Sequence, residues 1–266
     1  MTGQIQDRNS QMVDNLRADL QPRYEPNFAW KGITGLYQAL PALRGFWPCS
    51  AQINTTQRTY LTDIANNFHC GDAGGIMWGY DDLIPYILFG EDCVCFYDDN
   101  AQFDITGTEP SVVAAERGVS LGCWIKPDTN NTNYSLISKY RVAANLSYLL
   151  ELVAGVPQFV VSTNGAATVT VTHTTPVTTG IWQYVSAQYW PSARMRVSLD
   201  DNSSVLVAGV PASIFNGDAQ FRIGASHGGS ENYYRGLFSC IYICASALST
   251  SIDTAIWQQT RAMYRR

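Results

Sequence analysis

The sequence predicts an all-β protein, in which an arm and a short helix flank a two-sheet antiparallel sandwich. Apolar residues recur at every second position almost without a break from Val119 onward, which is the spacing of strands with one buried face. Gly, Asn, Asp and Pro interrupt these runs about every 8–12 residues, as they do in sandwiches of short antiparallel strands. Helical spacing of apolar residues occurs near the two ends of the chain, before and after this region.

The strand pattern can be followed run by run. It begins with "GVSLGCWIKPD" at 118–128 and continues at 134–142, 146–153, 157–163, 167–174, 180–190 and 193–200, and "SVLVA", "AQFRIGAS" and "GLFSCIYICA" complete it. Turns are predicted at Ala154-Gly155, at Pro191-Ser192 and at the carboxylate pair Asp200-Asp201. The residues expected to face the core include Leu121, Cys123, Val169, Val171, Val185, Val197, Phe221 and Ile223.

Trp124 is unexpected on a strand that has one buried and one solvent-exposed face, because it lies on the side predicted to be exposed. Val119, Leu121, Cys123 and Ile125 form the apolar face of this run, so the indole lies on the opposite side. In a sandwich, a loop or an added arm can cover the outer face of a sheet. We therefore expect Trp124 to be packed under such a segment, and a ligand-binding role is the weaker alternative.

Residues 1–41 differ from the rest and are predicted to be an N-terminal arm, with the sandwich domain at 42–266. Met12, Leu16 and Leu20 lie four residues apart, which is the stripe of a short amphipathic helix, and Gln21-Pro22 ends it. Prolines and aromatic residues follow. The arm is expected to anchor the protein to a neighbouring subunit through Met12, Leu16, Leu20, Tyr24, Phe28, Trp30 and Tyr37.

Residues 249–264 read as a helix after the last strand. Ser249 or Thr250 is the expected N-cap, and Ile252, Ile256 and Met263 are expected on one side.

Composition and charge weigh against several classes of protein. The net charge is −5, and no run of Lys or Arg exceeds two residues, so a nucleic-acid-binding role is not expected. The N-terminus lacks the order of a secretory signal, and the longest apolar runs are too short to insert into a membrane. The seven cysteines are therefore expected to be reduced thiols, without a disulfide.

Catalytic and metal-binding patterns were not found. The chain has six Glu, and none has the spacing of the carboxylate pairs with which some sandwiches cleave polysaccharides. No nucleophile motif surrounds any of the three His. We therefore predict that the chain is not an enzyme and that it needs no cofactor or metal. Calcium stays open as an alternative, with Asp98, Asp99, Asn100, Asp128 and Asp218 as candidate ligands.

Aromatic residues beside polar loops suit the mixed apolar and hydroxyl surface of a sugar. The candidate glycan contacts are Tyr189, Trp190, His227, Tyr233 and Tyr234. The alternative is that these side chains pack at the edge of the sandwich or on a neighbour.

Motifs along the chain resemble one known family. "ALRGFWPCS", "VSLGCWIKPD", "SLISKY", "GIWQYVSAQYW", "RMRVSLDD" and "YYRGLFSCIYICASALSTSI" occur in the order seen in concanavalin A-like, or laminin-G-like, jelly-roll domains. The chain departs from that pattern at Tyr184, where the family has His, and at Asp201, where it has Gly. The resemblance runs from about residue 42 to 262 and implies a jelly-roll sandwich.

In overall plan, a jelly roll with an appended arm is similar to virion proteins of tailed bacteriophages. This resemblance implies a non-enzymatic structural protein of the virion, on the capsid or tail, displaying a lectin-like module. The implied partners are other copies of the chain, a major capsid or tail protein, and a host-surface glycan. The alternative is a carbohydrate-binding adhesin or receptor-binding module.

Overall fold

The computed structural model describes residues 35–49, 60–61, 65, 70–73, 77–81, 84–89, 94–97, 102–141, 145–226 and 232–264, with the backbone alone at 60–61, 70–73 and 77–80. The chain divides into two compact units, Met1–Gly35 and Leu36–Arg266. The second unit is the sandwich. Six residues of the predicted assembly arm lie outside the described residues, namely Met12, Leu16, Leu20, Tyr24, Phe28 and Trp30.

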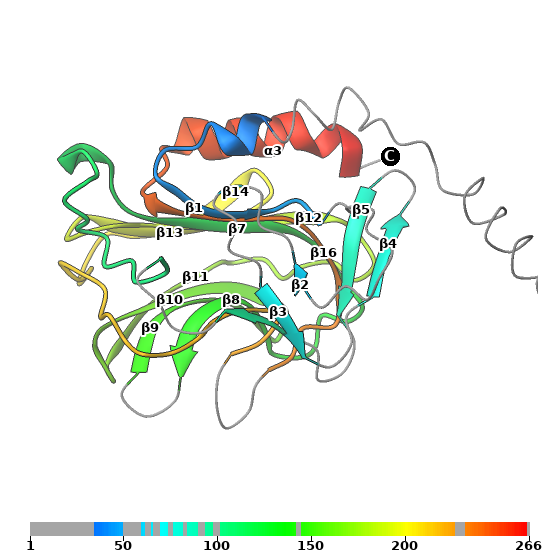
Figure 1. Cartoon of the computed structure of the whole chain (residues 1–266), viewed down its shortest axis with the longest axis horizontal. Helices are drawn as coiled ribbons and strands as arrows, with labels where there is room; N and C mark the ends of the chain where they lie inside the picture. Colours follow the sequence, from blue (N-terminus) through cyan, green and yellow to red (C-terminus); the bar gives the residue numbers. More distant parts are fainter. Residues whose placement is uncertain are drawn as a thin grey trace, which may run out of the picture. The chain divides into compact units, whose positions relative to one another are not determined.

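Two antiparallel sheets form the sandwich, as predicted (Figure 1). The first sheet has the order β14 (Asn202–Leu206), β13 (Arg194–Leu199), β12 (Gln183–Trp190), β7 (Arg117–Pro127), β16 (Gly236–Ser246), β5 (Ile84–Phe89), β4 (Met77–Asp81), and β1 (Leu43–Trp47) also pairs with β16. The second has the order β11 (Thr168–Thr172), β10 (Val156–Gly165), β9 (Asn145–Val153), β8 (Tyr134–Arg141), β15 (Phe221–Ile223), β6 (Val94–Tyr97), β3 (Cys70–Ala73), β2 (Tyr60–Leu61). A 3₁₀ turn, η1 (Ala114–Glu116), precedes β7, and the helix α3 (Thr250–Tyr264) follows β16.

Tight turns join neighbouring strands where the sequence predicts them. Ala154 and Gly155 both have positive φ, 49° and 78°, which suits the two-residue hairpin between β9 and β10. Ser192 has φ 55° in the turn after β12, and Asp200 has φ 57° in the turn after β13. These turns fix the register of the strands that they connect.

The core lies between the inner faces of the two sheets, and the predicted register is confirmed. Val169 is partly buried and packs against the core. The other predicted inward residues are buried within it, namely Leu121, Cys123, Val171, Val185, Val197, Phe221 and Ile223.

Trp124 lies on the outer face of β7, and α3 covers it. Its Nε1 donates a hydrogen bond to Thr260 Oγ1 at 3.0 Å, and its ring stacks on Tyr264 with the centroids 4.1 Å apart. Figure 1 shows α3 lying over the first sheet on the side away from the second sheet. Packing rather than ligand binding therefore accounts for this residue, and the covering segment is the C-terminal helix.

Of the three residues expected on one side of the helix α3, Ile256 is buried, Met263 is partly buried and Ile252 is exposed. Ser249 caps the helix, because Ser249 Oγ accepts the N–H of Ile252 at 3.3 Å. Ile252 is 37% exposed, whereas the buried positions are Asp253, Ile256, Trp257, Thr260 and Tyr264. The prediction counted aliphatic residues, but the sheet below offers polar partners that bury Asp253 and Thr260. In the described part of the chain, no helix has both the length and the apolarity needed to cross a membrane.

An ion pair beneath α3 fixes it to the first sheet. Asp253 accepts hydrogen bonds from Tyr184 OH and Ser186 Oγ, both at 3.0 Å, and from Arg196 Nη2 at 2.9 Å. All four side chains are buried. Burial raises the pKa of Asp253, and the Arg196 guanidinium opposes that effect. Because a buried charge without its partner is costly, this network sets the position of α3 on β12 and β13.

Tyr37 corrects the predicted extent of the arm. Its ring is fully buried and stacks on Phe46, a β1 residue, with the centroids 4.4 Å apart, and it also lies 5.5 Å from the ring of Tyr242. This residue therefore belongs to the core of its own domain and is not free to anchor a neighbour. The sequence pattern around it is as aromatic as that of the arm, which is why the two could not be separated.

The described cysteines are free thiols, as expected. They are buried, and they are Cys49, Cys95, Cys123, Cys240 and Cys244. The side chains of Cys70 and Cys93 lie outside the described residues.

Candidate functional site

The predicted aromatic contacts do not come together in one site. Tyr189 pairs with Val119 at the start of β7, whereas Gly236, close to Tyr234, pairs with Pro127 at its end. Eight residues of strand separate the two positions, a distance of about 26 Å. The two aromatic groups therefore lie at opposite ends of the first sheet.

Tyr189 and Tyr234 are core residues, which corrects their prediction as glycan contacts. Both side chains have no exposed surface. Tyr189 OH donates a hydrogen bond to the Pro211 carbonyl at 2.8 Å, and the Tyr234 ring packs 4.3 Å from that of Phe238. The sequence placed them in turns but could not show that each ring points inward.

Trp190 and Tyr233 remain partly exposed. The guanidinium of Arg194 lies 4.0 Å from the centroid of the Trp190 ring, and that of Arg196 lies at 5.9 Å. One cation therefore already stacks on the Trp190 ring. His227 lies outside the described residues.

A row of polar side chains crosses the outer face of the second sheet. Ser135 on β8 pairs with Glu151 on β9, Glu151 pairs with Gln158 on β10, and Gln158 pairs with Thr172 on β11. The neighbours of these residues along each strand face the core, so strand alternation turns all four outward. We call Ser135, Glu151, Gln158 and Thr172 the polar row; it spans about 14 Å, or three inter-strand spacings.

Burial changes along the polar row. Ser135 is fully buried, its N–H donates a hydrogen bond to the Asn232 carbonyl at 2.8 Å, and its Oγ has no hydrogen-bond partner among the described residues. Glu151 and Gln158 are partly exposed, and Thr172 is exposed. The part that a ligand can reach is therefore the segment from Glu151 to Thr172.

Glu151 is the electrostatically unusual member of the row. Burial raises its pKa from 4.5 to about 7. The pKa of Tyr140 on β8 is also raised, by burial and then by the negative charge of Glu151. Near neutral pH the carboxyl group can therefore either donate or accept a hydrogen bond.

The surroundings of the row are also rich in hydroxyl groups. Thr168 and Thr170 are exposed beside Thr172 on β11, and the buried Leu149 and Val160 lie between the polar positions on the same face. The groups that this face exposes around the row are therefore hydroxyl, amide and carboxyl groups. The alternation that predicts the inward residues of these strands also identifies the residues that face outward, so the sequence contained this signal.

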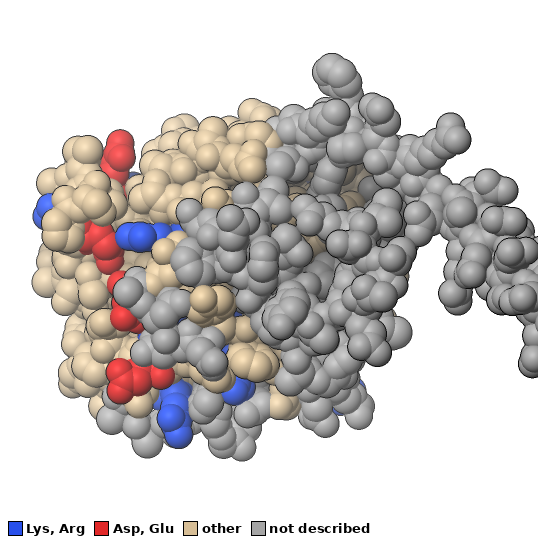
Figure 2. Space-filling model, in the orientation of Figure 1, with Lys and Arg blue, Asp and Glu red and all other residues tan. Residues whose placement is uncertain are grey.

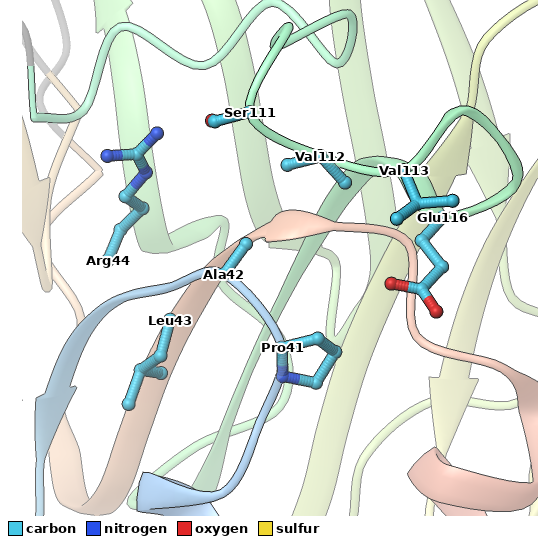
Figure 3. A pocket seen from close by; sticks show the side chains of 8 residues that line it. All are labelled: Pro41, Ala42, Leu43, Arg44, Ser111, Val112, Val113 and Glu116. Atoms are coloured by element: carbon cyan, nitrogen blue, oxygen red, sulfur yellow. The ribbon is translucent and has the colours of Figure 1, made fainter.

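A surface hollow of about 360 Å³ lies at another place (Figure 3). Residues 41–44, residues 111–113 and Glu116 line it, with Arg44 and Glu116 on opposite sides. Its volume is within the range of small-ligand sites. Its lining contains none of the predicted contact residues, and its polar side chains are Arg44, Ser111 and Glu116.

Among the described residues, no group of three or more His, Cys, Asp or Glu is placed to hold a metal ion. Asp128 Oδ1 accepts a hydrogen bond from Tyr134 OH at 3.1 Å, and Asp218 is exposed. Asp98, Asp99 and Asn100 lie outside the described residues.

Charged side chains of both signs lie on the described part of the face seen in Figure 2, and neither sign forms a continuous patch there.

The two antiparallel sheets and their strand order define the class of the fold, a two-sheet sandwich. A family model for the concanavalin A-like lectin/glucanases superfamily matches residues 99–251, which is more than half of the chain. The chain belongs to this superfamily. A search of curated proteins found no match to the sequence.

Solved structures with a similar fold include binding domains of toxins. They include the binding domain of botulinum neurotoxin DC in complex with SialylT (11% identity, TM-score 0.57) and the binding domain of Paraclostridial mosquitocidal protein 1 (11% identity, TM-score 0.60). A third is a structure of botulinum neurotoxin type C, whose cell entry depends on interaction with two ganglioside molecules (11% identity, TM-score 0.57). Each match covers 84–85% of this chain and 52% of the toxin chain. The chain spans about half the length of these structures, and identity this low shows the fold alone.

Proposed function

We propose that this chain is a non-enzymatic, lectin-like module that binds carbohydrate on the outer face of its second sheet. The observation that carries the proposal is the polar row, in which a carboxyl, an amide and a hydroxyl group lie on adjacent strands. Sugar hydroxyl groups both donate and accept hydrogen bonds, so side chains with both capacities suit them. The described helix α3 covers the first sheet instead, at Trp124 and Tyr184.

The chemistry of the row supports binding rather than cleavage. Two-carboxylate glycosidases place their carboxyl groups about 5–9.5 Å apart. Within the polar row, Glu151 is the one carboxylate, and Gln158 and Thr172 beside it are not acids. A row of this composition can orient a sugar but supplies one acid–base group.

The toxin domains of similar fold give a precedent at the level of the class. One of them is part of a toxin whose cell entry depends on gangliosides, which are glycan-bearing lipids. We extend only the class of ligand, a cell-surface glycan, to this chain, because the match covers half of each toxin structure.

A glycan array with the purified chain tests the proposal. We expect a defined group of glycans to bind, and Gln158→Ala to weaken binding about three- to tenfold, the worth of one hydrogen bond. Ser203→Ala is the matched control, since Ser203 is exposed on β14 of the first sheet. Equal loss in both variants, or no binding to any glycan, would count against the polar row.

A second location for the same activity is the turn that holds Trp190. Trp190→Ala separates the two sites, because it leaves the polar row untouched. Loss of glycan binding in this variant, with Gln158→Ala unaffected, would move the site to the stacked Trp190 and Arg194 pair.

We further propose that the module is displayed on a tailed-phage virion, where its N-terminal segment binds other copies of the chain or a major capsid or tail protein. The apolar stripe of Met12, Leu16 and Leu20 supports this, as does the division of the chain at Gly35. Deleting residues 1–34 spares Tyr37, and the truncated protein is expected to fold but to be missing from assembled particles. Incorporation at the normal copy number would contradict virion anchoring and leave glycan binding unaffected.

A further inference from the structure

Lys139 is buried inside one end of the sandwich. It lies on β8 between Tyr148 of β9 and Phe221 of β15, two core residues, so its side chain starts from the inner face of the second sheet. Only 1% of the side chain is exposed. A lysine so deeply buried needs compensating partners, because an ammonium ion without them is strongly disfavoured away from water.

Three oxygen atoms of the described residues lie close to the ammonium group. Lys139 Nζ donates hydrogen bonds to the carbonyl of Gly217 and, at 3.0 Å, to that of Ala219. Asp104 Oδ1 lies 2.9 Å from the same nitrogen. Within the described residues, two carbonyl oxygens accept hydrogen bonds from the ammonium group, and one carboxylate oxygen forms an ion pair with it. We call Asp104, Gly217 and Ala219 the oxygen cage.

The oxygen cage joins segments that are far apart in the sequence. Asp104 comes from the segment before β7, and Gly217 and Ala219 come from the segment before β15. Asn216 Nδ2 also donates to Asp104 Oδ2 at 3.1 Å, and the Gly217 N–H donates to Ser147 Oγ at 3.2 Å. The positive charge therefore lies where two connecting segments cross the end of the second sheet.

Backbone carbonyl and carboxylate oxygens are also the ligands with which proteins bind Ca²⁺. We propose that the ammonium group of Lys139 is a built-in cation, which takes the position in the oxygen cage that a metal ion would otherwise take. The end of the sandwich is then closed without a bound ion at this place.

This assignment also explains the position of Asp218, which the sequence indicated as a candidate calcium ligand. Asp218 lies between the two cage carbonyls, yet its own side chain is exposed. The carbonyls on either side of it bind Lys139, so the oxygen atoms of this loop that face inward are already used.

The test removes the internal cation and offers calcium in its place. Thermal unfolding is measured for the full chain, for Lys139→Ala and for Lys139→Met, each with excess EDTA and with millimolar CaCl₂. Both variants should melt roughly 6–20 °C below the native chain in EDTA, as expected when a buried ion pair loses one partner. Calcium should raise the melting temperature of Lys139→Ala, whose shortened side chain leaves the cage empty, by several degrees more than that of Lys139→Met, whose side chain fills it.

The double variant Lys139→Ala/Asp104→Asn is the matched control, and its response to calcium should be smaller than that of Lys139→Ala. If Lys139→Ala does not fold unaided, its refolding yield with and without calcium gives the same comparison. The proposal would be overturned if Lys139→Met were as stable as the native chain. It would also be overturned if calcium raised the melting temperatures of Lys139→Ala and the double variant equally.

Discussion

Trp124 shows how a residue on the outer face of a sheet can become part of a core. Its indole N–H is satisfied by Thr260, and its ring surface is covered by Tyr264, so both the polar and the apolar part have partners. A buried Trp without a hydrogen-bond partner would cost free energy, and Thr260 removes that cost. Both partners come from one helix, which makes this residue a link between strand β7 and helix α3.

Glu151 makes the stability of the protein depend on pH. Its pKa is about 7 in the folded chain and 4.5 as an ordinary value, so the folded state holds this proton more tightly than the unfolded state. Stability from this group is therefore fully present below about pH 4.5 and declines as the pH rises through 7. Glu151→Gln should be more stable than the native chain at pH 8, by about 1–2 kcal/mol once water at this partly exposed site is allowed for.

Thermal unfolding of the native chain and Glu151→Gln, measured at pH 4 and at pH 8, checks this expectation. The melting temperatures of the two proteins should differ at pH 8 and be nearly equal at pH 4. A gap of the same size at both values would mean that the substitution changes packing rather than ionisation.

At the scale of the element, the inward stripe of α3 is polar at its start and aromatic at its end. Asp253 binds Tyr184, Ser186 and Arg196, and Tyr264 OH donates to Ser239 Oγ at 2.8 Å. The helix therefore matches one particular sheet surface. Hydrophobicity alone cannot identify this inward face of the helix. Burial of its polar residue Asp253 is favourable only because hydrogen-bonding partners lie opposite it.

Strand β11 allows a sharp test of the register of the second sheet. Val171 is 4% exposed and faces the core, whereas its neighbour Thr172 is exposed on the other face. Val171→Asp should lower the free energy of unfolding by roughly 3–5 kcal/mol, because it buries an unpaired carboxylate. Thr172→Asp should change it by less than about 0.5 kcal/mol.

Urea denaturation of the two variants measures both values under the same conditions. Similar losses in the two would mean that β11 has no inward and outward face, and would contradict the register.

At the scale of the whole molecule, the two sheets of the sandwich have different surroundings. The first sheet is covered by α3, and Tyr37 packs against β1 and β16 at the start of the domain. The outer face of the second sheet carries the polar row. This difference is what places the proposed carbohydrate site on one sheet and the packing segments on the other.

The boundary of the domain can be located by truncation. A chain that starts at residue 35 keeps Tyr37 and Leu40, which are both buried, whereas a chain that starts at residue 41 loses them. The shorter chain should be less stable than the longer one by about 3 kcal/mol or more, the cost of removing a buried aromatic ring. Equal melting temperatures for the two truncated chains would mean that Tyr37 belongs to the N-terminal arm and does not stabilise the sandwich domain.

Much of this fold could be predicted from the sequence, whereas little of the candidate site could. The alternation around Val171, Val185 and Val197 specified strands and their inward faces. A shift of one residue would turn every apolar side chain of the strand to the outer face, so only one of the two faces can be the buried one. The same alternation did not reveal that Ser135, Glu151 and Gln158 form one row. The row depends on which strands pair and in which register, and alternation within one strand does not specify that pairing. Tyr189 and Tyr234 were misplaced for the opposite reason: aromatic residues near turns pack inward as readily as outward.

The sequence by itself determined the sandwich, its turns at Ala154-Gly155 and Asp200, and its membership of the concanavalin A-like superfamily, because these depend on local spacing and on the order of motifs along the chain. Tertiary structure alone decided which segment covers Trp124, which face α3 turns inward, and where Lys139 finds its oxygen partners. Each of these depends on groups more than 75 residues apart or on polar atoms whose burial is favourable only with the right partner beside them. Such partners meet only when the chain has folded.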